Sequence, residues 1–182
     1  MVVDWLAGFF NWVFEFANTA VEFYGLLGLF VASIIANATL FLPLPITIVT
    51  FSMGALAFSN GWGLGFVVLV GIASGLGAAI GELSGYIAGF LGGKALDKAK
   101  KDTKREGKLE EVALKIEKHG MAIIFVGTFL PLPFDFFGIA AGLAKYNVKK
   151  FFVATAAGKI VRDILIASAG FFGFELIQGI LF

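Results

Sequence analysis

The chain has 182 residues, of which 59% are hydrophobic and 15% charged, and its mean hydropathy is +0.92. A soluble domain is about 45–50% apolar and about 25% charged, so this composition excludes an ordinary water-soluble domain and predicts an integral membrane protein. The absence of cysteine excludes a disulfide scaffold, and a net charge of +1 argues against nucleic acid as a partner.

The first 24 residues are predicted to form an amphipathic helix at the membrane surface. Their polar side chains recur at helical spacing and form one stripe, made of Asp4, Asn11, Glu15, Asn18 and Glu22. The rest of the helix is aromatic and aliphatic, which is typical of a segment lying in the headgroup region. The alternative is that the polar stripe lines a pathway through the membrane.

The distribution of charge predicts the orientation of the chain. No charged residue occurs from Phe23 to Gly81, a run of 59 residues, which is long enough for two or three passes or part-passes. All fourteen Lys and Arg lie at or after Lys94, and nine of them fall in residues 94–118. Short basic segments stay in the cytoplasm, so residues 94–118 are predicted to be a cytoplasmic charged loop or helix of a multi-pass cell-membrane protein.

The four prolines occur in two Leu-Pro-Leu-Pro sequences, which place Pro43, Pro45, Pro131 and Pro133 at two sharp helix breaks. In the second copy the apolar arms on either side are only about eleven residues long, roughly half of what a spanning helix needs. Basic residues flank this copy on both sides. We therefore predict re-entrant hairpins at 25–59 and 119–144, with a single kinked spanning helix as the alternative.

The flanking residues repeat as well, at an offset of 87 or 88, which indicates an internal duplication. Each hairpin is followed by an apolar segment, 62–93 or 150–182, that is predicted to cross the membrane. The predicted fold is an all-α integral membrane protein, one domain over 1–182, built as an inverted repeat of a re-entrant Pro-turn hairpin plus a transmembrane helix. Broken backbone at membrane depth is tolerated where it is buried or lines a wet cavity, so the two hairpin tips are predicted to meet at a midplane site.

The first crossing segment carries a glycine ladder with a step of four residues: Gly77, Gly81, Gly85, Gly89 and Gly93. Such a ladder lets another backbone approach closely. Its predicted partner is a hairpin of the same chain or a second subunit, which makes a homo-oligomer possible.

Ionisable residues inside the apolar segments are the main functional candidates, because an unpaired charge in a bilayer is costly. Counted from the basic ends, Glu82, Arg162 and Asp163 lie at similar depth, with Lys159 one turn nearer the cytoplasm and Asp135 just beyond the second Pro turn. One interpretation is a neutral network in which Glu82 or Asp135 pairs with Arg162 and holds the two halves together.

The functional interpretation assigns Arg162 and Lys159 to an anionic lipid headgroup, because Arg suits bidentate phosphate contact and Lys adds a point charge. Asn37 and Thr47 would add hydrogen bonds to the substrate. The carboxylates Glu82, Asp135 and Asp163 would then couple transport to protons or sodium.

No nucleophile–base pair, phosphate-binding loop or metal-ligand cluster occurs in the sequence, so an enzyme, a cofactor and a metal site are not expected. The single histidine, His119, stands where the charged segment returns to the membrane and is interpreted as an interfacial residue.

The paired Pro-turn hairpins, the segment Gly81–Gly89 with Ser84 and Tyr86, and the sequence from Phe129 to Arg162 resemble the DedA superfamily, also called the VTT or SNARE-associated Golgi-protein family. The resemblance covers roughly residues 25–180. The sequence from Gly158 to Arg162, Gly-Lys-Ile-Val-Arg, is similar to the YqaA-like branch. The resemblance implies two opposed re-entrant hairpins and movement of lipids, including undecaprenyl phosphate or phospholipids, with proton or sodium dependence in some bacterial members.

The sequence departs from the bacterial pattern of that family at several polar positions. Asn37 falls where a glutamate is expected, Ile46–Thr47 where an acidic residue is expected, and Thr128 and Phe134–Asp135 where arginines are expected. Arg162, Lys159, Glu82 and Asp135 are the residues that could have taken over these roles.

The leading functional hypothesis is a flippase- or scramblase-like lipid transporter that moves an anionic headgroup, such as a polyprenyl phosphate, through the midplane site. The alternative is a proton- or sodium-coupled transporter of a small solute. A non-transporting membrane scaffold is a third class, but it gives no reason for the ionic residues in the apolar segments.

Overall fold

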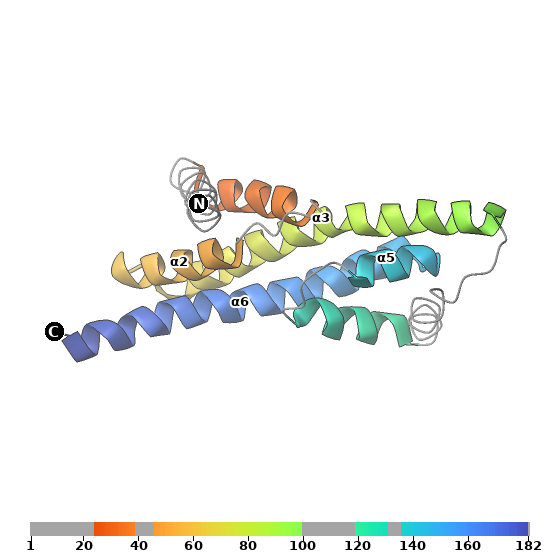
Figure 1. Ribbon diagram of the computed structural model, residues 1–182. Helices are drawn as coiled ribbons and strands as arrows, with labels where there is room; N and C mark the ends of the chain where they lie inside the picture. The colour runs from red at the N-terminus through yellow and green to blue at the C-terminus, as the bar shows by residue number, and fades with distance from the viewer. Residues whose placement is uncertain (1–23, 39–45, 100–118, 131–135, 182) are drawn as a thin grey trace, which may run out of the picture.

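The computed structural model of the protein describes residues 24–38, 46–99, 119–130 and 136–181, and every regular element in these ranges is a helix (Figure 1). The elements in chain order are the helix Tyr24–Ala38, α2 (Ile46–Ser59), α3 (Gly63–Ala99), the helix His119–Phe129, α5 (Phe136–Leu143) and α6 (Val148–Leu181). The all-α prediction is confirmed for this part of the chain. The predicted interfacial helix, both Pro turns, Asp135 and residues 100–118 lie outside the described residues.

Two long helices, α3 and α6, run the length of the molecule. Within α3, Gly63–Gly93 is long and apolar enough to cross a membrane, and it is the one stretch of the described helices that meets both conditions. The segment 62–93, predicted from the sequence to cross the membrane, is thus almost entirely helical, and the helix itself continues to Ala99; the crossing stays a prediction. Helix α6 has 34 residues, a length of roughly 50 Å, but it carries charged residues in its middle, so its crossing stays a prediction.

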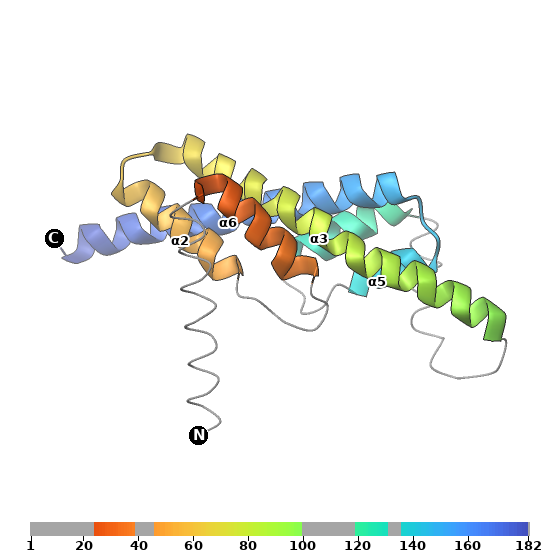
Figure 2. The same cartoon turned by 90° about the horizontal axis from the view of Figure 1, so that it is seen from above.

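The two long helices lie side by side and antiparallel, as both ribbon views show (Figures 1 and 2). Their closest approach is made by glycines: a Cβ on Gly71 would lie 2.6 Å from the backbone nitrogen of Ile164, and one on Gly75 would lie 2.6 Å from the Cα of Ile160. Only residues without a Cβ allow this distance between helix axes. The register of α3 on α6 is therefore set by these two glycines.

The shorter helices pack across the two halves of the chain. Helix α2 lies on α6, where Gly54 contacts the backbone of Ala167, while α5 lies on α3, where Gly142 contacts the backbone of Tyr86. The first arm of each predicted hairpin contacts the long helix that follows it: Gly77 of α3 contacts Phe30, and Gly158 of α6 contacts Phe125. Each long helix is thus covered by helices from both halves.

The glycine ladder of α3 contacts the short helices of the same chain. Gly77 and Gly81 face the helix Tyr24–Ala38, while Gly89 and Gly93 face α5. This is the first of the two partners expected from the sequence. A homo-oligomer along the ladder stays a prediction.

The turns that end α2 and α5 have the same geometry. Gly61 and Lys145 both adopt positive φ, at 69° and 52°, and the backbone N–H that follows each one donates to a carbonyl five residues earlier. These positions differ by 84 residues, so the predicted constant offset of 87 or 88 is wrong here. The reason is that α5, with 8 residues, is shorter than α2, with 14.

The start of α6 is fixed by a side-chain cap. The side-chain oxygen Oδ1 of Asn147 accepts hydrogen bonds from the backbone N–H groups of Lys149, at 3.0 Å, and Lys150, at 3.1 Å. A cap of this kind satisfies backbone donors that have no partner within the helix.

The polarity of the molecule is reversed relative to a soluble protein. Large apolar side chains are exposed on the helix Tyr24–Ala38, α2, α3, the helix His119–Phe129 and α6, among them Leu27, Phe51, Leu91, Val126 and Leu165. The buried side chains include the polar and charged residues Ser33, Thr50, Ser74, Glu82, Thr128, Thr155, Lys159 and Asp163. In water this arrangement is unfavourable, whereas a lipid-exposed helical bundle turns its ionisable groups inward. Burial thus supports the membrane assignment independently of composition.

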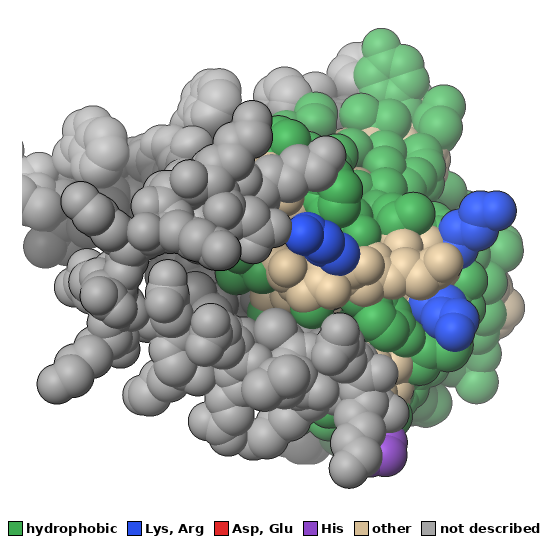
Figure 3. Space-filling model, turned by 90° about the vertical axis from the view of Figure 1, so that its right-hand side faces the viewer, with side chains coloured by type: hydrophobic (Ala, Val, Ile, Leu, Met, Phe, Trp, Pro, Cys, Tyr) green, Lys and Arg blue, Asp and Glu red, His purple; other side chains and the backbone are tan. Residues whose placement is uncertain are grey.

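One end of the molecule is basic. Lys145, Lys149 and Lys150 are exposed at the turn into α6, and His119 is exposed at the same end; Figure 3 shows basic and histidine side chains around hydrophobic surface there. This placement fits the predicted cytoplasmic end of the bundle.

Candidate functional site: a buried polar network at the crossing of the long helices

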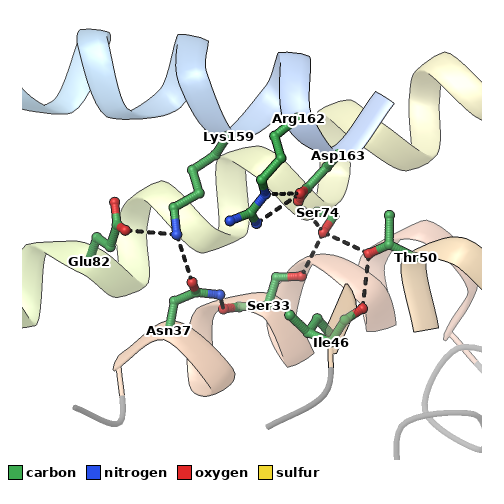
Figure 4. Close-up of polar contacts among 9 residues, drawn as sticks. All are labelled: Ser33, Asn37, Ile46, Thr50, Ser74, Glu82, Lys159, Arg162 and Asp163. Carbon is green, nitrogen blue, oxygen red and sulfur yellow. Dashed lines mark hydrogen bonds and ion pairs between the residues drawn. The ribbon is translucent and has the colours of Figure 1, made fainter. Parts of the chain in front are cut away.

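Lys159 of α6 lies at the centre of the first part of the network. Its Nζ is 2.7 Å from Glu82 Oε1 of α3 and donates a hydrogen bond of 3.1 Å to Asn37 Oδ1 of the helix Tyr24–Ala38 (Figure 4). The side chains of Lys159 and Glu82 are only 5% and 4% exposed. An ion pair with this little water is far less screened than one at a protein surface.

Asn37 is oriented by its own helix. Its side-chain Nδ2 donates to the backbone carbonyl of Ser33 at 2.9 Å, which turns Oδ1 toward the lysine. Lys159 therefore has a carboxylate on one helix and an amide oxygen on another. The ion pair joins α3 to α6, and the hydrogen bond to Asn37 joins the helix Tyr24–Ala38 to α6.

Asp163 of α6, one turn beyond Lys159, lies at the centre of the second part. Its Oδ2 accepts a hydrogen bond of 2.6 Å from the hydroxyl of Ser74 on α3. Its Oδ1 accepts one of 2.8 Å from Nε of Arg162 and lies 2.8 Å from the terminal Nη2 of the same guanidinium. One carboxylate oxygen therefore contacts Ser74 of α3, and the other contacts Arg162 of α6.

Hydroxyl groups extend this second part to two further helices. Ser74 Oγ lies 3.3 Å from Ser33 Oγ and 3.1 Å from Thr50 Oγ1, and Thr50 also donates to the backbone carbonyl of Ile46 at 3.0 Å. Ser33, Thr50 and Ser74 are each at most 1% exposed. Side chains from four helices, namely Tyr24–Ala38, α2, α3 and α6, therefore meet at one buried point.

The four charged groups form two neutral pairs, which corrects the pairing expected from the sequence. Arg162 is paired with its neighbour Asp163 and not with Glu82, which pairs with Lys159. The physical reason is the register of the long helices: Gly75 faces Ile160, so Ser74 is brought opposite Asp163, and the flexible lysine reaches Glu82 two turns along α3. Of the two partners expected for Arg162, Glu82 is therefore wrong, and Asp135 lies outside the described residues.

Most of the predicted site residues come together here. Arg162, Lys159, Asn37, Glu82 and Asp163 all belong to the network. Thr47 is exposed at the beginning of α2, whereas Thr50, one turn later, enters the network; a role for Thr47 stays a prediction.

The sequence analysis missed Ser33 and Ser74. A usable signal was present in the spacing, because Ser33 precedes Asn37 by four residues and Ser74 precedes Glu82 by eight, which puts each serine on the same helix face as a candidate residue. Serine is common in apolar helices, however, and carries no charge to mark it.

The family model of the VTT domain matches residues 44–172, well over half of the chain. The matched region contains Thr50, Ser74, Glu82, Lys159, Arg162 and Asp163, whereas Ser33 and Asn37 precede it. No curated protein and no solved structure matches the chain. Members of the family are generally membrane-associated and are proposed to be transporter-like. Because the match covers well over half of its residues, the chain belongs to the VTT domain family.

Proposed function

We propose that the protein is a membrane lipid transporter, similar to a flippase or scramblase, that moves an anionic lipid headgroup past the network at the α3–α6 crossing. The observation that carries the proposal is the placement of two cations, Lys159 and Arg162, inside a bundle whose outer surface is apolar. A polar path of this kind lets a charged headgroup leave the bilayer surface while its tails remain in lipid. A polyprenyl phosphate is one such substrate.

The proposed topology is a multi-pass inverted repeat of two re-entrant hairpins, each followed by a crossing helix. The reciprocal contacts support it: α2 lies on α6 and α5 lies on α3, which is the exchange expected when two similar halves are related by a two-fold axis in the membrane plane. In this topology the Pro turns place both hairpin tips near the middle of the bilayer.

Arg162 is the residue proposed to contact the headgroup. Its side chain is 16% exposed, against 3% for Asp163, so it is the more accessible member of its pair. A guanidinium binds phosphate oxygens through two parallel N–H donors, which suits an anionic headgroup better than a carboxylate or a hydroxyl.

Arg162→Gln is expected to abolish headgroup movement in proteoliposomes that contain a fluorescent anionic lipid, because the amide cannot supply the positive charge. The measurement is the rate at which a membrane-impermeant quencher gains access to the labelled headgroup. Lys150→Gln is the matched control, since it removes an exposed cation from the same helix. Wild-type rates in the Arg162→Gln protein would refute the assignment.

A second candidate function is proton- or sodium-coupled transport of a small solute. It is favoured by the ion pairing among the described residues, in which Lys159 and Arg162 each already have a carboxylate partner. Here Glu82 is the proposed coupling residue. Solute-dependent uptake of protons or sodium into vesicles, lost in Glu82→Gln, would support this candidate; lipid movement without ion movement would exclude it.

A further inference from the structure

The Arg162–Asp163 pair has an unusual geometry. Residues adjacent in a helix point in directions about 100° apart and do not normally face each other. Here Nε and Nη2 of the arginine both approach one oxygen, Asp163 Oδ1, each at 2.8 Å (Figure 4). The contact therefore depends on the conformation of the arginine side chain, not on the helix alone.

Asp163 is anchored to the bundle by more contacts than Arg162 is. The second oxygen of Asp163 accepts the 2.6 Å hydrogen bond from Ser74, whose hydroxyl lies within 3.3 Å of those of Ser33 and Thr50, so the carboxylate is fixed to the core of the bundle. Arg162 is the more exposed of the two, and within the described part of the chain its side chain makes its two polar contacts with Asp163. If the pair separates, the guanidinium moves and the carboxylate stays.

We propose that Asp163 is a built-in competitor for the headgroup: it occupies Arg162 when the site is empty and releases it when an anionic headgroup arrives. The proposal rests on the proposed lipid transport. Asp163 then acts as a positioning residue that sets how tightly the site holds its anionic substrate. Both anions offer oxygens to the same donors, so one replaces the other without leaving the guanidinium uncompensated.

Competition by Asp163 also affects how fast the headgroup leaves the site. A transport site must bind its substrate firmly enough to admit it and weakly enough to let it leave. An intramolecular carboxylate beside the arginine lowers the apparent affinity and speeds departure of the headgroup. Removing the competitor should therefore tighten binding and slow transport, a combination that a purely structural role would not produce.

Asp163→Asn tests this directly, because the amide oxygen keeps an acceptor for Ser74, whereas the negative charge and the acceptor for Arg162 are lost. We expect the variant to bind an anionic lipid roughly tenfold more tightly than the wild type and to move it more slowly. Binding is measured by native mass spectrometry with phosphatidylglycerol, a polyprenyl phosphate and inorganic phosphate as separate probes, which distinguishes a lipid headgroup from a free phosphate. Glu175→Gln is the matched control, since it removes an exposed carboxylate from the same helix.

Asp163→Glu should restore affinity close to the wild-type value because the carboxylate returns. If Asp163→Asn does not fold in neutral detergent, adding the anionic lipid should restore its thermal transition, since the headgroup supplies the missing negative charge; no rescue would overturn the proposal. If the wild type moves lipid and Asp163→Asn binds the anionic lipid with the same affinity as the wild type, the proposal is also overturned. A wild type that neither binds nor moves anionic lipid would instead refute the transport function beneath it.

Discussion

Glu82→Gln and Lys159→Gln are each expected to destabilise the protein by about 3–5 kcal/mol, because each substitution leaves one uncompensated charge inside the bundle. For a chain of this length the thermal midpoint should fall by roughly 10 °C. The double variant Glu82→Gln/Lys159→Gln should recover most of this loss, since neither charge then remains. The measurement is the thermal unfolding of the purified proteins in one detergent, followed by circular dichroism.

Lys150→Gln is the control for this series, because it removes an exposed lysine from the first turn of α6 and should leave the midpoint unchanged. The decisive comparison is between the single and the double variants. If the double variant were as unstable as the sum of the two singles, the ion pair at 2.7 Å would contribute nothing specific, and the network would have to be held by its hydroxyl and amide contacts.

Gly54→Ala is expected to displace α2 from α6, with a cost of about 3 kcal/mol or more. The added Cβ would overlap the backbone carbonyl oxygen of Ala167, and a helix backbone cannot turn aside as a side chain can. The same thermal unfolding experiment measures the cost, and lipid movement should be lost with it because α2 carries Thr50 into the network.

Gly92→Ala is the matched control, since a Cβ at this position of α3 meets nothing within 4 Å. It should be neutral or stabilising by up to about 1 kcal/mol, because alanine favours a helix more than glycine does. If the thermal midpoints of Gly54→Ala and Gly92→Ala were similar, α2 would not be packed tightly on α6, and the expected overlap with Ala167 would be wrong.

The composition and the run of residues without charge predict the helical class and the position of the apolar stretch Gly63–Gly93. Both properties depend on the chemistry of whole segments, which can be read without knowing how the helices pack. The similar depth of Glu82, Arg162 and Asp163 in the membrane stays a prediction, which rests on the constant rise of a helix and on the basic ends as markers of the membrane boundary.

The pairing of these residues could not be predicted in the same way. It depends on the rotation of α3 against α6, which is set by two glycine contacts, and on how far a lysine side chain can reach. The offset of 87 places Asn60 of the first half opposite Asn147 of the second, but the two side chains differ in role: Asn147 caps α6, whereas the side-chain amide of Asn60 donates to the backbone carbonyl of Leu56.

The reciprocal packing of α2 on α6 and of α5 on α3 bears on the order in which the protein is made. When the ribosome has completed α2 and α3, the surface that α2 must contact, including Ala167, has not yet been synthesised. The first half is therefore made without its packing partner, and Gly54, Ser74 and Glu82 have no contact with α6 until α6 has been synthesised. Packing of α6 then completes the core and pairs Glu82 with Lys159 in one event, so formation of the core depends on α6.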